Sequence, residues 1–184
     1  MKKGLPILSL LLLSVTLILN GCEKESASDD PAISDKSLYE HTVYSMAKCF
    51  KDVYNQNLAG HPAGGQNMTV NGPMGGTVII TGNTSYDQTH GITTVDLVFN
   101  MTSVKYTTNS NDWLTEITMT GSITYTGSFS DSYTSLNHQS SAMQITGTVT
   151  HDGDERAIDE SGPVSINLSD SDITANIFGH SVSW

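Results

Sequence analysis

Basic residues are scarce in this chain of 184 residues, where 8 Lys and Arg face 19 Asp and Glu for a formal net charge of -11. A phosphate backbone would repel such a chain, so nucleic acid is not expected as a partner. The chain has 2 cysteines, and none of its 6 histidines stands near another His or a Cys at the spacing of a zinc site. It also lacks a P-loop, a dinucleotide fingerprint and a Gly-x-Ser-x-Gly elbow. Without a convergent acid, base and nucleophile, the sequence predicts a protein that is not an enzyme.

The N-terminal segment, residues 1–21, has the organisation of a secretory signal. Lys2 and Lys3 precede an apolar run over 5–19, which is short for a membrane-spanning helix. The run ends in Leu19-Asn20-Gly21-Cys22, which resembles the lipobox of bacterial lipoproteins. The resemblance implies cleavage before Cys22, a diacylglycerol thioether on its sulfur and an acyl chain such as palmitate on its amine. We therefore expect Cys22 to be the lipid-attachment residue, and these covalent lipids to be the only prosthetic groups.

Residues 22–33 follow as a polar, acidic stretch that predicts a flexible tether. In enteric-type sorting, Asp directly after the lipidated cysteine retains a lipoprotein in the inner membrane, whereas Glu23 stands there in this chain. The acidic stretch is also similar to the surface-export signal of Bacteroidetes-type lipoproteins. An outer-membrane lipoprotein that faces the periplasm or the cell surface is the expected localisation.

One amphipathic helix is predicted near the start of the mature chain. Ser37-Leu38-Tyr39-Glu40 has the form of a capping box, and Gly60 followed by Pro62 provides a stop signal. Apolar residues then recur every three or four positions and form one stripe that needs a partner surface. The stripe consists of Tyr39, Val43, Met46, Phe50, Val53 and Tyr54.

The remainder of the chain alternates apolar and polar residues with a period of two, which is typical of antiparallel strands with one buried face. About six strands are expected, separated by Asn-, Asp- and Gly-containing turns. Their ranges are 76–81, 93–106, 113–129, 143–150, 164–169 and 173–184. Gly121, Gly127 and Gly147 on the inward face would permit bending or a close backbone approach.

These elements predict a single α+β domain over residues 34–184, mainly β. We expect a curved antiparallel meander with the helix packed on its concave face. That outline is similar to periplasmic lipoprotein carriers of the LolA and LppX type, a resemblance of fold that does not establish function.

Two functions follow from this fold. The first is a monomeric, non-catalytic envelope lipoprotein that contacts the membrane through its anchor and an envelope protein or glycan through its surface. The second is a carrier of a hydrophobic ligand held between helix and sheet, which requires an apolar cavity of a few hundred Å³. The sequence favours the first function. Large residues beside Gly121 and Gly127 suggest that Phe50 or Tyr54 fills the space, so we expect no cavity above about 300 Å³.

The remaining side chains that could act in catalysis or bind a metal ion have simpler interpretations. Cys49, beside the helix stripe, is expected to be a half-buried, inert thiol. The histidines are expected at the surface. A cluster of acids could supply oxygen ligands to Ca²⁺ if two neighbouring loops met, although solvated loop acids are the favoured interpretation. The carboxylates in question are Asp152, Asp154, Asp159, Asp170 and Asp172.

Overall fold

A computed structural model describes residues 33–170 and 172–183. The predicted signal, Cys22 and nearly all of the predicted tether lie outside these residues, as do Ser171 and Trp184. Ile33, assigned from the sequence to the end of the tether, is 3% exposed and belongs to the hydrophobic core.

Helix α1 spans Asp35–Asn57. Its N-cap is Ser34, whose side-chain oxygen accepts a hydrogen bond from the backbone N–H of Ser37 at 3.1 Å. The capping box predicted at Ser37 is therefore wrong, because the helix begins one turn earlier. Every residue of the predicted stripe is at most 8% exposed. The stripe is thus confirmed as the buried face of α1.

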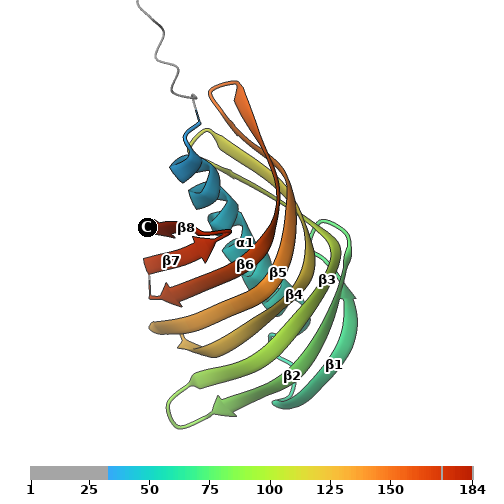
Figure 1. Cartoon of the computed structure of the whole chain (residues 1–184). Coiled ribbons are helices and arrows are strands. Elements are labelled where there is room, and N and C mark those ends of the chain that lie inside the picture. The colour runs from blue at the N-terminus through green and yellow to red at the C-terminus, as the bar shows by residue number, and fades with distance from the viewer. Residues whose placement is uncertain (1–32, 171, 184) are drawn as a thin grey trace, which may run out of the picture. The chain divides into compact units, whose positions relative to one another are not determined.

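The rest of the described chain forms one open sheet of eight antiparallel strands whose spatial order follows the sequence. The broad prediction of a mainly β, α+β fold is confirmed, but the expected number of about six strands is wrong. Figure 1 shows the sheet curving around α1. The strands are β1 (Gly64–Asn71), β2 (Thr77–Asp87), β3 (Ile92–Ser110), β4 (Trp113–Ser130), β5 (Tyr133–His151), β6 (Asp154–Ser169), β7 (Asp172–Ile177) and β8 (His180–Ser183).

The two additional strands come from segments whose sequence signals are weak. Gly64-Gly65 begins β1, where only Met68 and Val70 provide apolar alternation against the core. The segment expected as one strand over 173–184 contains a turn at Phe178-Gly179, where both residues have positive φ. It therefore forms the hairpin β7–β8.

The curvature of the sheet has a local cause in three register shifts. They lie at Met101–Val104 in the β3–β4 pairing, at Gly121–Thr124 in the β4–β5 pairing and at Ser140–Met143 in the β5–β6 pairing, and the register places the extra residues on β3 and β5. Extra residues of this kind bend a strand and increase its twist. The long central strands therefore bend where they would otherwise extend straight past the helix.

The inward glycines allow neighbouring strands of the sheet to approach closely. A Cβ on Gly127 would lie 2.1 Å from the carbonyl oxygen of Ser135, and one on Gly121 would lie 2.8 Å from that of Ala142. The predicted close backbone approach is confirmed. The Cβ position of each glycine is occupied by the neighbouring strand, so close strand pairing requires glycine there.

Polar contacts fix both ends of α1 to the sheet. Near its start, Arg156 of β6 donates to the Ile33 carbonyl at 3.0 Å and pairs with Asp35, and the Tyr39 hydroxyl donates to Glu160 at 2.5 Å. Near its end, the Tyr106 hydroxyl donates to Asp52 at 2.5 Å. These contacts therefore hold the helix in one orientation against the sheet and fix the space between the two.

Candidate functional site

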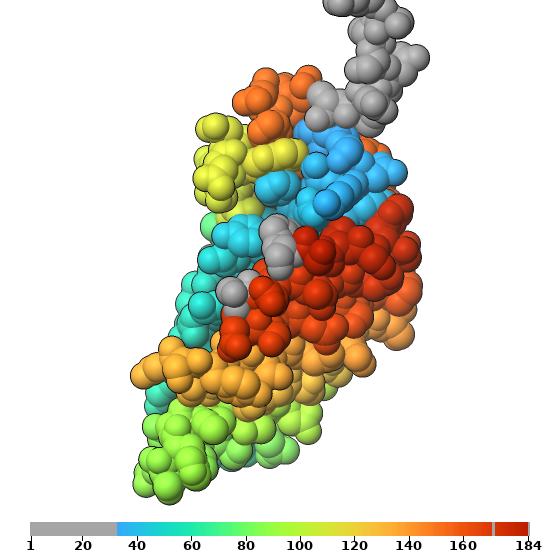
Figure 2. Space-filling model, turned by 90° about the vertical axis from the view of Figure 1, so that its left-hand side faces the viewer, coloured from blue at the N-terminus to red at the C-terminus, as the bar shows by residue number. Residues whose placement is uncertain are grey.

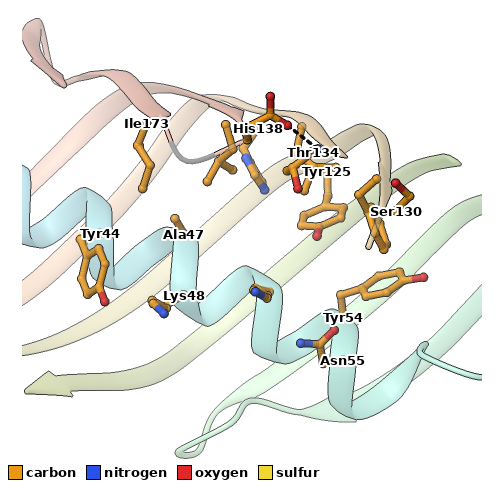
Figure 3. Close-up of a pocket in the computed structure, with 15 residues that line it drawn as sticks. Tyr44, Ala47, Lys48, Tyr54, Asn55, Tyr125, Ser130, Thr134, His138 and Ile173 are labelled. Carbon is orange, nitrogen blue, oxygen red and sulfur yellow. Dashed lines mark hydrogen bonds between the residues drawn. The ribbon is translucent and has the colours of Figure 1, made fainter. Parts of the chain in front are cut away.

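A pocket of about 480 Å³ lies between α1 and the sheet, toward the C-terminal half of the helix (Figure 3). The expectation of no cavity above about 300 Å³ is wrong. Helix residues line one side, and β4, β5, β6 and β7 supply the other. The aliphatic part of the wall consists of Ala47, Leu136, Leu168 and Ile173, and the aromatic part includes Tyr54, Tyr125 and Phe129.

The pocket exists because the apolar stripe of α1 does not reach all of the curved sheet. Tyr54 turns toward β4, where its ring stacks on Tyr125 at 5.9 Å between centroids and meets the edge of Phe129 at 5.3 Å. Phe50 packs on His138 of β5 at 5.2 Å. Tyr54, Tyr125 and Phe129 form the β4 end of the pocket, and Leu168, Asp170 and Ile173 line it at the β6–β7 end.

Two lysines border the pocket from the exposed side of α1. Lys48 and Lys51 are one turn apart, and both are solvent-exposed. The Lys48 ammonium lies 5.4 Å from the centre of the Tyr44 ring. Within residues 33–170 and 172–183 the chain has only five Lys and Arg side chains, so two of them meet at this pocket. In Figure 2, α1 (blue to cyan) lies at the surface beside the red C-terminal strands.

Asp170 and His138 supply further polar groups. Asp170 follows β6, and its Oδ1 accepts a hydrogen bond from the Thr134 backbone at 3.0 Å. His138 is 1% exposed, and its ring lies 4.8 Å from Tyr125 in an edge-on contact. Burial lowers the pKa of His138 to about 4, so the imidazole is neutral at neutral pH.

Sequence reasoning placed His138 at the surface, and the register shift in β5 explains the error. Leu136 and His138 occupy even positions, whereas Met143 and Ile145 occupy odd positions on the same buried face. The extra residues between Ser140 and Met143 change which positions face inward. Leu136 is an apolar residue two positions before His138, so both side chains share one face of the strand. It is the one feature of the sequence that indicates that His138 points inward.

The five candidate calcium ligands do not come together. Asp152 and Asp154 lie at one end of β6, and Asp170 and Asp172 lie beyond its other end. Asp159 is exposed in the middle of the strand. The sixteen residues of β6, roughly 50 Å of extended chain measured along the strand, separate the two turns. Among the described residues, no group of three or more His, Cys, Asp or Glu side chains is arranged to hold a metal ion.

Cys49 is more buried than its sequence position suggests. It is 0% exposed within the core, and burial raises the pKa of its thiol to about 12. The side chain therefore remains a neutral thiol, which is a poor nucleophile.

A second pocket of about 490 Å³ lies at the end of α1 near β2. Its lining is of mixed polarity and comes from the end of α1, the segment after it, β2 and β3; it includes Leu58, His61, Ser85 and Tyr86. It lacks the combination of an apolar wall with basic side chains that distinguishes the pocket beside His138.

No helix in the described part of the chain combines the length and apolar character needed to cross a membrane.

No family model, curated protein or solved structure matches this chain significantly.

Proposed function

We propose that this chain is a non-catalytic, outer-membrane lipoprotein, anchored through Cys22, that binds an amphipathic anion between α1 and the sheet. The observation that carries the binding proposal is the pocket of about 480 Å³ with an aliphatic wall and two lysines at its edge. Pockets of this volume hold small ligands. We therefore favour binding of a ligand with an apolar body, which was the alternative from the sequence. It takes the place of the function in which the domain has no cavity and contacts an envelope component through its surface.

The charges assign an orientation to the ligand. Lys48 and Lys51 face the opening from the helix, while Asp170 stands at the far strands. An acidic head group is attracted to the lysines and repelled by Asp170. The apolar body then lies along Leu136, Leu168 and Ile173, which are partly exposed and gain burial when it binds.

The anchor and the pocket are compatible parts of one function. A lipid-anchored protein stays at a membrane surface essentially permanently. A binding domain on that anchor would hold its ligand at the same surface. The buried thiol of Cys49 supports a role in binding and not in covalent catalysis.

A titration with decanoate and decylammonium tests the proposal. The mature chain from residue 22, with Ser in place of Cys22, keeps the domain and removes the acyl groups. We expect calorimetry to show binding of decanoate and at least about tenfold weaker binding of decylammonium, because the head-group charge is reversed.

Variants locate the binding within the molecule. Lys48→Gln combined with Lys51→Gln should weaken decanoate binding about tenfold at low salt. Lys36→Gln is the matched control, since Lys36 is exposed on the same helix and pairs with Glu40 away from this pocket. Equal affinity for the two amphiphiles, or equal loss in both lysine variants, would contradict the proposal.

A further inference from the structure

His138 carries a hydrogen-bonding atom that the fold leaves unused. Its Nδ1 lies 3.4 Å from the carbonyl oxygen of Ile166. Its Nε2 is buried and has no hydrogen-bond partner among the described residues. The side chain lines the pocket, and Figure 3 shows the ring pointing from the sheet toward α1. Leaving such an atom unpaired costs stability, because it has given up its hydrogen bond to water.

The chemistry of Nε2 follows from its neighbours. The Ile166 carbonyl can only accept, so the contact assigns the imidazole hydrogen to Nδ1. Phe50 and Tyr125 place aromatic rings around the imidazole and supply no charge that would stabilise an imidazolium ion. In the neutral ring, Nε2 is therefore a hydrogen-bond acceptor.

We infer that the ligand of this pocket is a hydroxylated amphipathic acid, whose hydroxyl group, on the apolar body, donates a hydrogen bond to Nε2 of His138. The inference rests on the proposed function, because it specifies the ligand of the same pocket. An ionised carboxylate has no hydrogen to donate, so the acid group belongs at Lys48 and Lys51. The hydroxyl is a second recognition point, on the strand side of the pocket.

This arrangement would make the pocket selective as well as apolar. A hydroxyl buried without a partner weakens binding, since it loses its hydrogen bonds to water. A hydroxyl that reaches Nε2 reverses that penalty and also satisfies the buried nitrogen. Polar sites of this kind reject analogues that lack the matching group.

Decanoic acid and its hydroxylated derivatives form the test. The mature chain with Ser in place of Cys22 is titrated with decanoic acid and with a series in which one hydroxyl moves along the chain. We expect at least one hydroxy acid to bind about fivefold or more tightly than decanoic acid. In His138→Phe, which preserves an aromatic ring beside Phe50, the same hydroxy acid should bind more weakly than decanoic acid.

His138→Gln provides a second variant, because Gln can still accept a hydrogen bond if the aromatic replacement disturbs the core. It should retain part of the preference for the hydroxy acid. If decanoic acid binds and every hydroxy acid binds more weakly to the unchanged domain, the inference is overturned while the proposed function stands. If none of the acids binds, both the proposed function and this inference fail.

Discussion

Gly147 on β5 has a backbone conformation and a neighbour that together exclude any other residue. Its φ is +152°, and a Cβ there would lie 1.9 Å from the carbonyl oxygen of Glu116 on β4. Gly153, in the turn before β6, has φ +90° with nothing within 4 Å of its Cβ position. Alanine substitutions at these two glycines therefore separate the cost of backbone strain from the cost of a clash between strands.

We expect Gly147→Ala to lower the free energy of unfolding by more than about 3 kcal/mol, since it adds a clash to the strain. Gly153→Ala should cost about 1 to 2 kcal/mol from strain alone. Urea unfolding of both variants measures the difference. Equal costs would mean that β4 and β5 are not as close at Gly147 as described.

His138 makes stability depend on pH in a defined direction. Burial holds its pKa at about 4 in the folded state, below the ordinary value of 6.5. Between these values the unfolded chain binds the proton and the folded chain does not. Stability should therefore fall as the pH falls from 6.5 to 4, by about 3 kcal/mol in total.

Comparing unfolding free energies at pH 7 and pH 4.5 in the unchanged domain and in His138→Phe isolates this effect. The variant should lose less stability over the interval, because carboxylates titrate in both proteins and the imidazole in only one. Identical losses in the two proteins would show that His138 is not buried in its neutral form.

At the scale of elements, Phe50 links the helix to the sheet. It is 0% exposed and stacks on His138 of β5. Phe50→Ala should cost about 3 kcal/mol or more, as expected for a large buried aromatic residue. Lys51→Ala on the next residue, which is exposed, should cost less than about 0.5 kcal/mol. Similar small losses in both variants would show that α1 does not pack on the sheet.

The helix and the strands β3 and β4 could be predicted because their patterns extend over many residues, whereas β5 and β6 were expected only over 143–150 and 164–169. The stripe through Phe50 repeats over about four turns, and the alternation through Ile117 and Met119 covers most of β4. The shorter elements could not be predicted. Strand β1 begins with Gly-Gly-Gln-Asn, and the β7–β8 turn places Phe178 at positive φ, a conformation that its residue type disfavours.

The pocket was harder to anticipate than the elements that form it. Register shifts decide which strand positions face inward, and the one in β5 moved His138 into the core. A cavity depends on how far a curved sheet diverges from a helix, which apolar periodicity does not specify. Lys48 and Lys51 are exposed on α1, and their position at a pocket edge is a tertiary feature that the helical pattern does not specify.

At the scale of the whole molecule, the anchor is a separate prediction from the domain. Cys22→Ser should abolish incorporation of a palmitate analogue, because the thioether lipid is required before the later acylation. Cys49→Ser is the matched control, since the only other cysteine is buried in the core. Labelling that persists in Cys22→Ser, or disappears in Cys49→Ser, would contradict the lipoprotein proposal.

Binding of an amphiphile between α1 and the sheet is measured most directly by a methyl-resolved NMR titration of the mature domain with decanoate. We expect saturable shifts at Leu136, Leu168 and Ile173, which line the pocket beside α1. The methyl group of Ala63 in the second pocket should remain unchanged. Shifts at Ala63 without shifts at the three pocket residues, or no saturable shift at all, would contradict an amphiphile site between α1 and the sheet.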